Sequence, residues 1–315
     1  PGQVQLRVLT CGVCHTELDE IEGRTPPPHF PMIPGHQIVG IVTKLGEGTS
    51  LHKIGDRVGV GWIHSACGNC EFCQSEQENL CPEFQATGRD FDGGYAEYTQ
   101  VPERFAIPIP DSISDGEAAP LLCAGAIGYR SLALCEFKDG YNLGLMGFGA
   151  SAHLVLKMVK HLYPQSSVFV FARSERERDF AIELGACWAG DINDNPPELI
   201  NCIIDTTPAW KPVTEALGFL KPGGRLVINA IRKEDRDRAH LSTLEYEHQL
   251  WMEKEIKSVA NVTRKDISEF LNLAASIPIH PEFTEYPLEE ANVALSELKN
   301  RKIRGAKVLR VSESE

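Results

Sequence analysis

Four cysteines lie close together in the sequence, at a spacing suited to holding a metal ion. Cys67, Cys70 and Cys73 follow one another with two residues between them, and Cys81 comes after seven further residues. Zinc prefers four such ligands in a tetrahedron, and a closed shell of four thiolates leaves no position for a substrate. The spacing therefore predicts a structural zinc, with buried unligated cysteines or two disulfides as the alternatives.

Three further residues of metal-binding type are spread along the chain. They are Cys14, His36 (which follows Gly35) and Cys123. Spacing alone cannot unite them, because a lone histidine after glycine is more often a turn or core residue and a lone cysteine in an apolar stretch is usually just buried. From the residues alone a shared site remains one possibility among these. The other cysteines show no partner pattern and are expected to be structural: Cys11, Cys135, Cys187 and Cys202.

A glycine-rich turn predicts a dinucleotide site. The apolar stretch 142–146 leads into Gly147, Gly149 and Ala152, and a helical pattern then continues to about Tyr163. In a strand–turn–helix of this kind the first glycine permits the tight turn, the second lets a pyrophosphate approach the backbone, and the small third residue allows close packing. The helix N-terminus then offers amide donors to the phosphates. An ordinary glycine-rich turn is the alternative.

Strands and helices alternate beyond this turn. Strands are expected at 167–172, 201–205, 225–229 and 255–260, helices at 175–184, 212–220 and 266–275, and a turn at 221–224. This alternation predicts a doubly wound parallel sheet of Rossmann type over residues 125–260. The charged run 232–238 is expected to be a solvated loop.

The end of the second strand bears on the choice of cofactor. NAD enzymes usually carry an acid there to hold the ribose 2′-hydroxyl. This chain has Arg173 and Ser174 instead, which suit a 2′-phosphate through charge-assisted hydrogen bonds. The sequence therefore favours NADP over NAD, with stacking of Arg173 on adenine as the alternative.

Composition excludes several classes of protein. The 315 residues carry 31 Lys and Arg against 44 Asp and Glu, a net charge of −13, which argues against a nucleic-acid partner. No apolar run is long enough for a membrane span. The alternating stretch 4–9 begins almost at Pro1, so we expect the N-terminus to be incomplete. With no signal segment and many thiols, a reducing cytoplasm is expected.

Several motifs together resemble the zinc-dependent alcohol dehydrogenases of the medium-chain dehydrogenase/reductase superfamily. They are Gly12–Thr16, Pro34–His36, Gly55–Val58, the four-cysteine lobe, Asp92–Tyr98, Pro120–Gly125 and the glycine-rich turn. The resemblance implies a mostly β, GroES-like catalytic domain from residues 1–124 and 261–315, with the nucleotide domain 125–260 inserted. It also implies two zinc ions per chain, a catalytic one on Cys14, His36 and Cys123 and a structural one on the four clustered cysteines.

The resemblance also suggests roles for individual side chains. Thr16 matches the hydroxyl that passes the substrate proton away from zinc, and His15 matches a contact to the cofactor pyrophosphate. Glu17 matches the acid beside the zinc, and Trp62 resembles a substrate-pocket aromatic, although a core role is equally compatible.

Two departures from the family pattern concern proton and ligand exchange. Gln37 stands where the family commonly has a glutamate after the zinc histidine, and Asp19 stands where it has a relay histidine. A carboxylate can still accept a proton, but its ordinary pKa near ~3.9 would shift the pH dependence. Neither change removes a required ligand.

The expected function is interconversion of alcohols with aldehydes or ketones by hydride transfer to or from NAD(P), with Thr16 and Asp19 relaying the proton. Polyol, formaldehyde or cinnamyl-type dehydrogenases on the same scaffold are the nearest alternatives. A non-catalytic zinc-binding interaction module and a non-catalytic relative are more distant ones. The family implies a dimer or tetramer, and the sequence does not choose between them.

Overall fold

The computed structural model describes residues 1–300 and 304–313. The chain divides into two compact units, one formed by Pro1–Ala126 with Asn261–Glu315 and the other by Ile127–Ala260. We call them unit 1 and unit 2. Within the described residues no helix is both long and apolar enough to cross a membrane.

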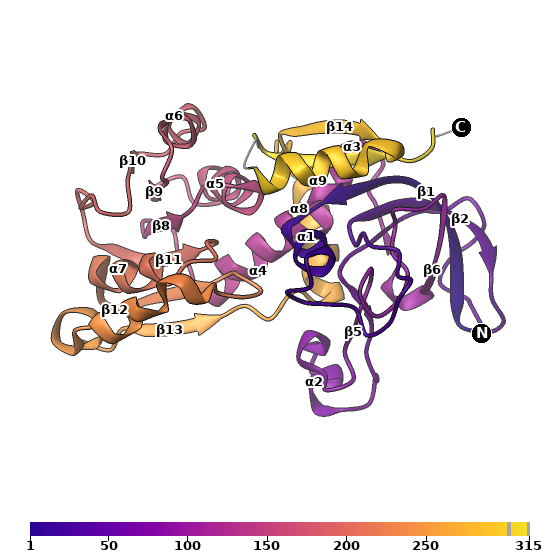
Figure 1. Cartoon of the computed structure of the whole chain (residues 1–315), viewed down its shortest axis with the longest axis horizontal. Helices are drawn as coiled ribbons and strands as arrows, with labels where there is room; N and C mark the ends of the chain where they lie inside the picture. Colours follow the sequence, from indigo (N-terminus) through magenta and orange to yellow (C-terminus); the bar gives the residue numbers. More distant parts are fainter. Residues whose placement is uncertain (301–303, 314–315) are drawn as a thin grey trace. The chain divides into compact units, whose positions relative to one another are not determined.

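Unit 1 is built on a largely antiparallel sheet whose central strand is β1 (Gln3–Val13), drawn in indigo in Figure 1. Alternate side chains Val4, Leu6 and Val8 of β1 are fully buried, as the period of a half-buried strand requires. The other strands of this sheet are β2 (Ile38–Leu45), β3 (Arg57–Val60), β6 (Tyr98–Pro102), β7 (Ile107–Pro108), β14 (Phe283–Pro287) and β15 (Ala306–Arg310). A separate pair, β4 (Ile63–Ser65) and β5 (Gln85–Ala86), adjoins the cysteine lobe in sequence.

The two ends of the chain meet on β1. Its residues Thr10–Val13 pair with β15, whereas Gln3–Arg7 pair with β6 on the same side. Because β15 completes the sheet, the C-terminal segment belongs to unit 1 although more than a hundred residues of unit 2 intervene.

Helices of unit 1 connect and cover these strands. They are α1 (His15–Ile21), α2 (Glu71–Gln74), α3 (Asp115–Pro120), α8 (Arg264–Ser276) and α9 (Ala291–Lys299), with short 3-10 segments at Glu78–Leu80, Glu103–Phe105 and Leu288–Glu290. A π-helical segment, Leu121–Gly125, joins α3 to α4 (Ala126–Leu134).

Unit 2 is a six-stranded sheet in which every pair of neighbouring strands is parallel. The order is β10-β9-β8-β11-β12-β13, so the direction of progression reverses between β8 and β11. Ligands bind at such a reversal, beyond the carboxyl ends of the strands. The strands are β8 (Asn142–Met146), β9 (Ser167–Phe171), β10 (Trp188–Gly190), β11 (Ile200–Asp205), β12 (Leu220–Ile228) and β13 (Glu255–Ser258).

The helices between these strands are α5 (Ala150–Leu162), α6 (Glu175–Glu183) and α7 (Lys211–Phe219). A 3-10 segment, Asp235–Thr243, and a π-helical segment, Tyr246–Leu250, precede β13. The parallel α/β sheet of unit 2 and the mostly β structure of unit 1 confirm the predicted fold class. Figure 1 shows β8, β11, β12 and β13 within the magenta-to-orange part of the chain.

Two local predictions in unit 2 were wrong. The predicted turn 221–224 lies inside β12, because the register shifts from Ile200↔Leu220 to Cys202↔Arg225 and the extra residues form a bulge. Gly223 takes a positive φ of 68° there, and its N–H donates to the Met252 carbonyl. The charged run is not a freely solvated loop either, since the Lys233 side chain is only 8% exposed and pairs with the fully buried Asp205.

We predict that Phe270 is a main contributor to the stability of unit 1. It is fully buried on α8, and its ring lies so close to Gly125 that a Cβ added to that glycine would meet it at 2.1 Å. Phe270→Ala should lower the free energy of unfolding by about 3–5 kcal/mol, because a cavity remains. Phe270→Leu, which keeps most of the volume, should cost much less. Equal urea midpoints for the alanine variant and the wild type would contradict this assignment.

Candidate metal and catalytic site

The structure brings together the three widely spaced residues Cys14, His36 and Cys123. One ligand atom from each lies within 4.8 Å of the other two, and His36 Nε2 is 3.2 Å from Cys123 Sγ. All three residues belong to unit 1. The convergence that spacing could not establish is thus a property of the fold.

Each of the three side chains is placed by a different local structure. Cys14 is the extended residue that precedes α1, and Cys123 lies in the π-helical segment, a widened turn often found at functional sites. His36 follows Gly35, whose φ of 103° lies in a backbone region that glycine adopts far more readily than other residues. A Cβ on Gly35 would also meet the Tyr95 ring at 2.4 Å, so a larger residue would displace the loop that carries His36.

Glu17 fixes the orientation of the histidine ring. Its carboxylate is fully buried and accepts hydrogen bonds from the Cys14 N–H at 2.8 Å and from the His36 ring through Nδ1. With Nδ1 held in this way, Nε2 is the nitrogen that faces Cys123. A carboxylate behind a histidine is a common arrangement at metal sites, because it sets the tautomer and makes the ring a stronger ligand.

The electrostatics of the cluster favour a bound cation. A hydrogen bond from Cys123 holds the pKa of Cys14 well below its usual range, and the same interaction raises the pKa of Cys123. Burial alone would lower the pKa of His36, but the Glu17 carboxylate and the Cys14 thiolate outweigh it and raise that pKa. The two half-buried thiols therefore disfavour ionising together, and a divalent ion between them would supply the positive charge that allows it.

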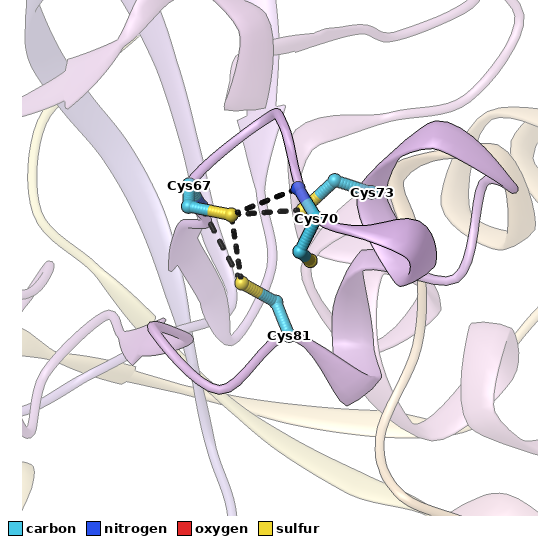
Figure 2. A group of neighbouring side chains, drawn as sticks. All are labelled: Cys67, Cys70, Cys73 and Cys81. Carbon is cyan, nitrogen blue, oxygen red and sulfur yellow. Dashed lines mark hydrogen bonds between the residues drawn. The ribbon is translucent and has the colours of Figure 1, made fainter.

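The four clustered cysteines also converge (Figure 2). Their sulfurs lie within 4.8 Å of one another, and Cys67 Sγ is 3.5 Å from Cys81 Sγ and 3.9 Å from Cys73 Sγ. Backbone N–H groups of Asn69 and Cys70 lower the pKa of Cys67 to about 7. All ten cysteines of the chain are free thiols, so the alternative of two disulfides does not describe this lobe.

The residues expected to act on substrate lie in different surroundings. Thr16 is half-buried, with Oγ1 3.8 Å from Cys14 Sγ. Trp62 is half-buried, and its ring centroid lies 5.2 Å from that of Phe84. His15 is exposed, whereas Asp19 is buried and forms an ion pair with Arg24 at 2.5 Å. The guanidinium therefore occupies one oxygen of the carboxylate expected to relay protons.

Gln37, which replaces the family's glutamate, is buried and packs over a glycine. Its Oε1 lies 2.3 Å from where a Cβ on Gly12 would be, so this glycine makes room for the Gln37 side chain.

Sequence reasoning missed Glu20. This residue is 5% exposed, and neither carboxylate oxygen has a hydrogen-bond partner among the described residues. Burial, together with repulsion from Glu17, raises the pKa of Glu20 to about 8. Glu20 lies on the same helix, α1, as Glu17, one turn further along and within electrostatic reach of His36 and Cys14. The one signal in the sequence is its position four residues after Thr16, on the same face of a helix.

The glycine-rich turn has the features that a dinucleotide requires. Gly147 has a φ of 83°, and Ala152 is fully buried where α5 packs on the sheet. A Cβ on Gly149 would meet nothing within 4 Å, so the protein itself gives no packing reason for a glycine there. This leaves space beside the first turn of α5 that a phosphate group would fill.

At the end of β9 the structure modifies the sequence-based expectation. Ser174 Oγ accepts from the Glu177 N–H at 3.2 Å and donates to the Glu177 carboxylate at 2.8 Å, so this hydroxyl caps α6. Arg173 is exposed. Arg178, which sequence reasoning missed, donates to the carbonyls of Ala172 and Arg173 and adds a second positive charge at this loop.

The raised pKa of Glu20 predicts a pH-dependent stability. Because the folded chain keeps this proton to about pH 8 and the unfolded chain loses it near 4.5, the carboxyl should destabilise the metal-free protein increasingly as pH rises between these values. Glu20→Gln should therefore gain in urea stability over the wild type between about pH 5 and about pH 9.

Glu22→Gln is the matched control. Lys299 and Arg24 lower the pKa of Glu22, so this variant should keep the wild-type slope above about pH 5. A Glu20→Gln protein with the wild-type slope would show that the carboxyl is not held in this buried, unpartnered state.

Comparisons with known proteins point to one family. Residues 1–111 match the family model of the alcohol dehydrogenase GroES-like domain. A probable alcohol dehydrogenase AdhA of Mycobacterium tuberculosis is 41% identical over 314 residues, which cover 98% of this chain and 89% of the relative. An alcohol dehydrogenase of Geobacillus stearothermophilus is 33% identical, covering 99% of this chain and 92% of the relative.

A solved cinnamyl alcohol dehydrogenase from Sorghum bicolor superposes with a TM-score of 0.87 at 28% identity, covering all of this chain and 91% of that one. The cinnamyl alcohol dehydrogenases are no more similar to this chain in sequence than the general alcohol dehydrogenases are. The chain therefore belongs to the alcohol dehydrogenases of the medium-chain dehydrogenase/reductase superfamily, enzymes that interconvert alcohols with aldehydes or ketones.

Proposed function

We propose that this chain is a zinc-dependent, NAD(P)-dependent dehydrogenase acting on primary or simple secondary alcohols. The observation that carries the proposal is the meeting of Cys14, His36 and Cys123, which come from three separate parts of the sequence, within 4.8 Å. Two thiolates and one imidazole form a ligand set that suits zinc and leaves a fourth position for a substrate.

Two zinc ions per chain fit the donor groups. Cys14, His36 and Cys123 would hold the catalytic ion, and Cys67, Cys70, Cys73 and Cys81 would hold the structural ion. Zinc at the first site would supply Lewis-acid chemistry, polarising the substrate oxygen and making its hydroxyl more acidic.

The remaining chemistry is assigned to side chains near the three ligands. With a metal bound, Glu17 would keep His36 in the tautomer in which Nε2 is free to act as a ligand. Thr16 Oγ1 accepts the proton of the substrate hydroxyl and passes it on, and Trp62 forms part of the apolar surface beside the substrate. Asp19 remains the proposed next acceptor, although its ion pair with Arg24 makes release of a proton to solvent dependent on that arginine.

The nicotinamide cofactor is assigned to the carboxyl edge of the parallel sheet. The open space at Gly149 suits a pyrophosphate, and the first amides of α5, which have no acceptor within their own helix, would donate to it. His15, which is exposed on unit 1, remains a proposed contact to the cofactor. Bound there, the nicotinamide would accept or supply the hydride.

The preference for NADP is proposed from Arg173. No acid stands at the end of β9 to bind a ribose 2′-hydroxyl, and two guanidinium groups, Arg173 and Arg178, lie at this loop. Ser174 contributes less than expected because its hydroxyl caps α6.

Self-association as a dimer or tetramer is proposed through the edge of unit 2. β13 ends the sheet, and all four of its residues are exposed, including Ile256. Trp251 and Met252, just before it, are 55% and 52% exposed. An exposed edge with apolar side chains favours pairing with another chain. Ten free thiols suit a reducing compartment, for which we propose the cytoplasm.

A direct test follows the formation of NAD(P)H by absorbance with a panel of short and aromatic alcohols. Zinc-loaded wild type should turn over, whereas Cys123→Ser should lose at least roughly a thousandfold in kcat, because the ligand set is broken. Cys187→Ser removes an exposed cysteine far from either cluster in sequence and should match the wild type. Full activity in a metal-free preparation would refute the proposal.

Arg173→Ala tests the choice of cofactor. Loss of a charge-assisted contact to the 2′-phosphate should raise the KM for NADP roughly tenfold or more and leave the KM for NAD nearly unchanged. Arg176→Ala, which removes an exposed arginine from the same region, is the control. A wild type that prefers NAD would overturn the assignment whatever the variant does.

A further inference from the structure

Lys233 makes contacts unusual for a lysine in a charged run. Its side chain is 8% exposed, and its ammonium group donates to the Asp205 carboxylate, to the Thr207 carbonyl at 2.8 Å and to the Ala209 carbonyl at 3.1 Å. Three N–H groups thus meet three acceptors. Because its donors are all used, Lys233 has none left for a ligand.

The neighbours of Lys233 bind the same loop. The Glu234 N–H donates to the Pro208 carbonyl at 2.7 Å. The Asp237 carboxylate accepts from the N–H groups of Trp210 and Lys211 at 2.9 and 3.0 Å, at the start of α7. The segment after β12 is therefore held by hydrogen bonds to residues 206–211, which follow β11.

This loop lies against the glycine-rich turn. Thr206 Oγ1 donates to the Met146 carbonyl at 3.0 Å. A Cβ on Gly147 would meet Thr206 Oγ1 at 2.9 Å and Thr207 Cγ2 at 3.1 Å. The position of the loop consequently limits the position of the turn.

A second connection runs from the same strands to α5. The Asn229 N–H donates to the Asp205 carbonyl at 2.7 Å, and the Asn229 amide reaches Ser151 Oγ, in the first turn of α5, at 3.5 Å. Asp205 itself is fully buried, and its other oxygen accepts from the N–H and hydroxyl of Thr207. The carboxyl ends of β8, β11 and β12 are thus joined by hydrogen bonds, and the buried Asp205–Lys233 ion pair lies among them.

We propose that Lys233 is a positioning residue for cofactor binding: it holds the loop 206–209 against Gly147 so that the turn and the first amides of α5 keep the arrangement that receives the pyrophosphate. This inference rests on the proposed function, because it concerns the same nucleotide site. A buried ion pair stabilises a fold little more than an apolar pair of similar size would. The role of the Lys233–Asp205 pair is therefore to fix one conformation of the loop.

Binding of NADPH and NADH, measured by fluorescence titration of the zinc-loaded protein, tests the proposal. Lys233→Met should weaken binding roughly tenfold or more and raise the KM for the cofactor, while kcat at saturating cofactor changes much less. Lys221→Met is the control, because Lys221 donates to Asn201 Oδ1 at 3.2 Å near the amino ends of the same strands. It should bind like the wild type.

The double variant Lys233→Met/Asp205→Asn separates positioning from stability. Removing the unpaired buried charge should recover most of the Tm lost in Lys233→Met, whereas cofactor affinity should stay low, because the carbonyls of Thr207 and Ala209 still lack their donor. An affinity that recovers together with the Tm would overturn the proposal, as would a Lys233→Met protein that binds like the wild type. A wild type that binds neither dinucleotide would instead refute the proposed function.

Discussion

Two half-buried thiols that disfavour ionising side by side form the constraint on which the candidate metal site of unit 1 depends. The hydrogen bond between Cys14 and Cys123 lowers the pKa of the first thiol and raises that of the second, so that one thiol keeps its proton when the other ionises. His36, held by Glu17, faces the same space. The local structures around them, the positive φ of Gly35 and the widened π-helical turn at Cys123, keep the three donors together.

Buried carboxyl groups add to the same demand for positive charge. Glu17 is fully buried beside His36, and Glu20 is buried with neither oxygen partnered among the described residues. Two acids and two thiols within electrostatic reach of one another disfavour ionising together, and a bound cation would relieve that repulsion. The Asp19–Arg24 ion pair, by contrast, balances its own charge, so a proton accepted by Asp19 would have to compete with the Arg24 guanidinium for that carboxylate.

Much of the fold and site follows from local patterns in the sequence. Strand 142–146, the glycine-rich turn and α5 lie where the alternation of apolar and small residues predicted them. The strand–helix alternation that follows confirmed the predicted class of sheet. The four-cysteine cluster was equally predictable from the sequence, because only fifteen residues of chain bring its four sulfurs together.

Features that depend on contacts between residues far apart in the sequence could not be predicted from the sequence. Pairing of β1 with β15 joins opposite ends of the chain, and no local pattern specifies it. Lys233 looked like part of a solvated run because its partner, Asp205, lies 28 residues earlier. Ser174 suited a phosphate by type, but its proximity to Glu177 makes it a helix cap. The meeting of Cys14, His36 and Cys123 could be inferred from family resemblance alone, since spacing gave no reason for it.

Anomalous X-ray diffraction at the zinc absorption edge, on crystals of the zinc-loaded protein, tests the central claim most directly. The account predicts two zinc peaks per chain. One should lie about 2.3 Å from the sulfurs of Cys14 and Cys123 and about 2.1 Å from His36 Nε2, with its fourth position open to solvent or substrate. The other should be surrounded by the four clustered cysteines. A single peak in the cysteine lobe, with no metal between Cys14 and Cys123, would contradict it.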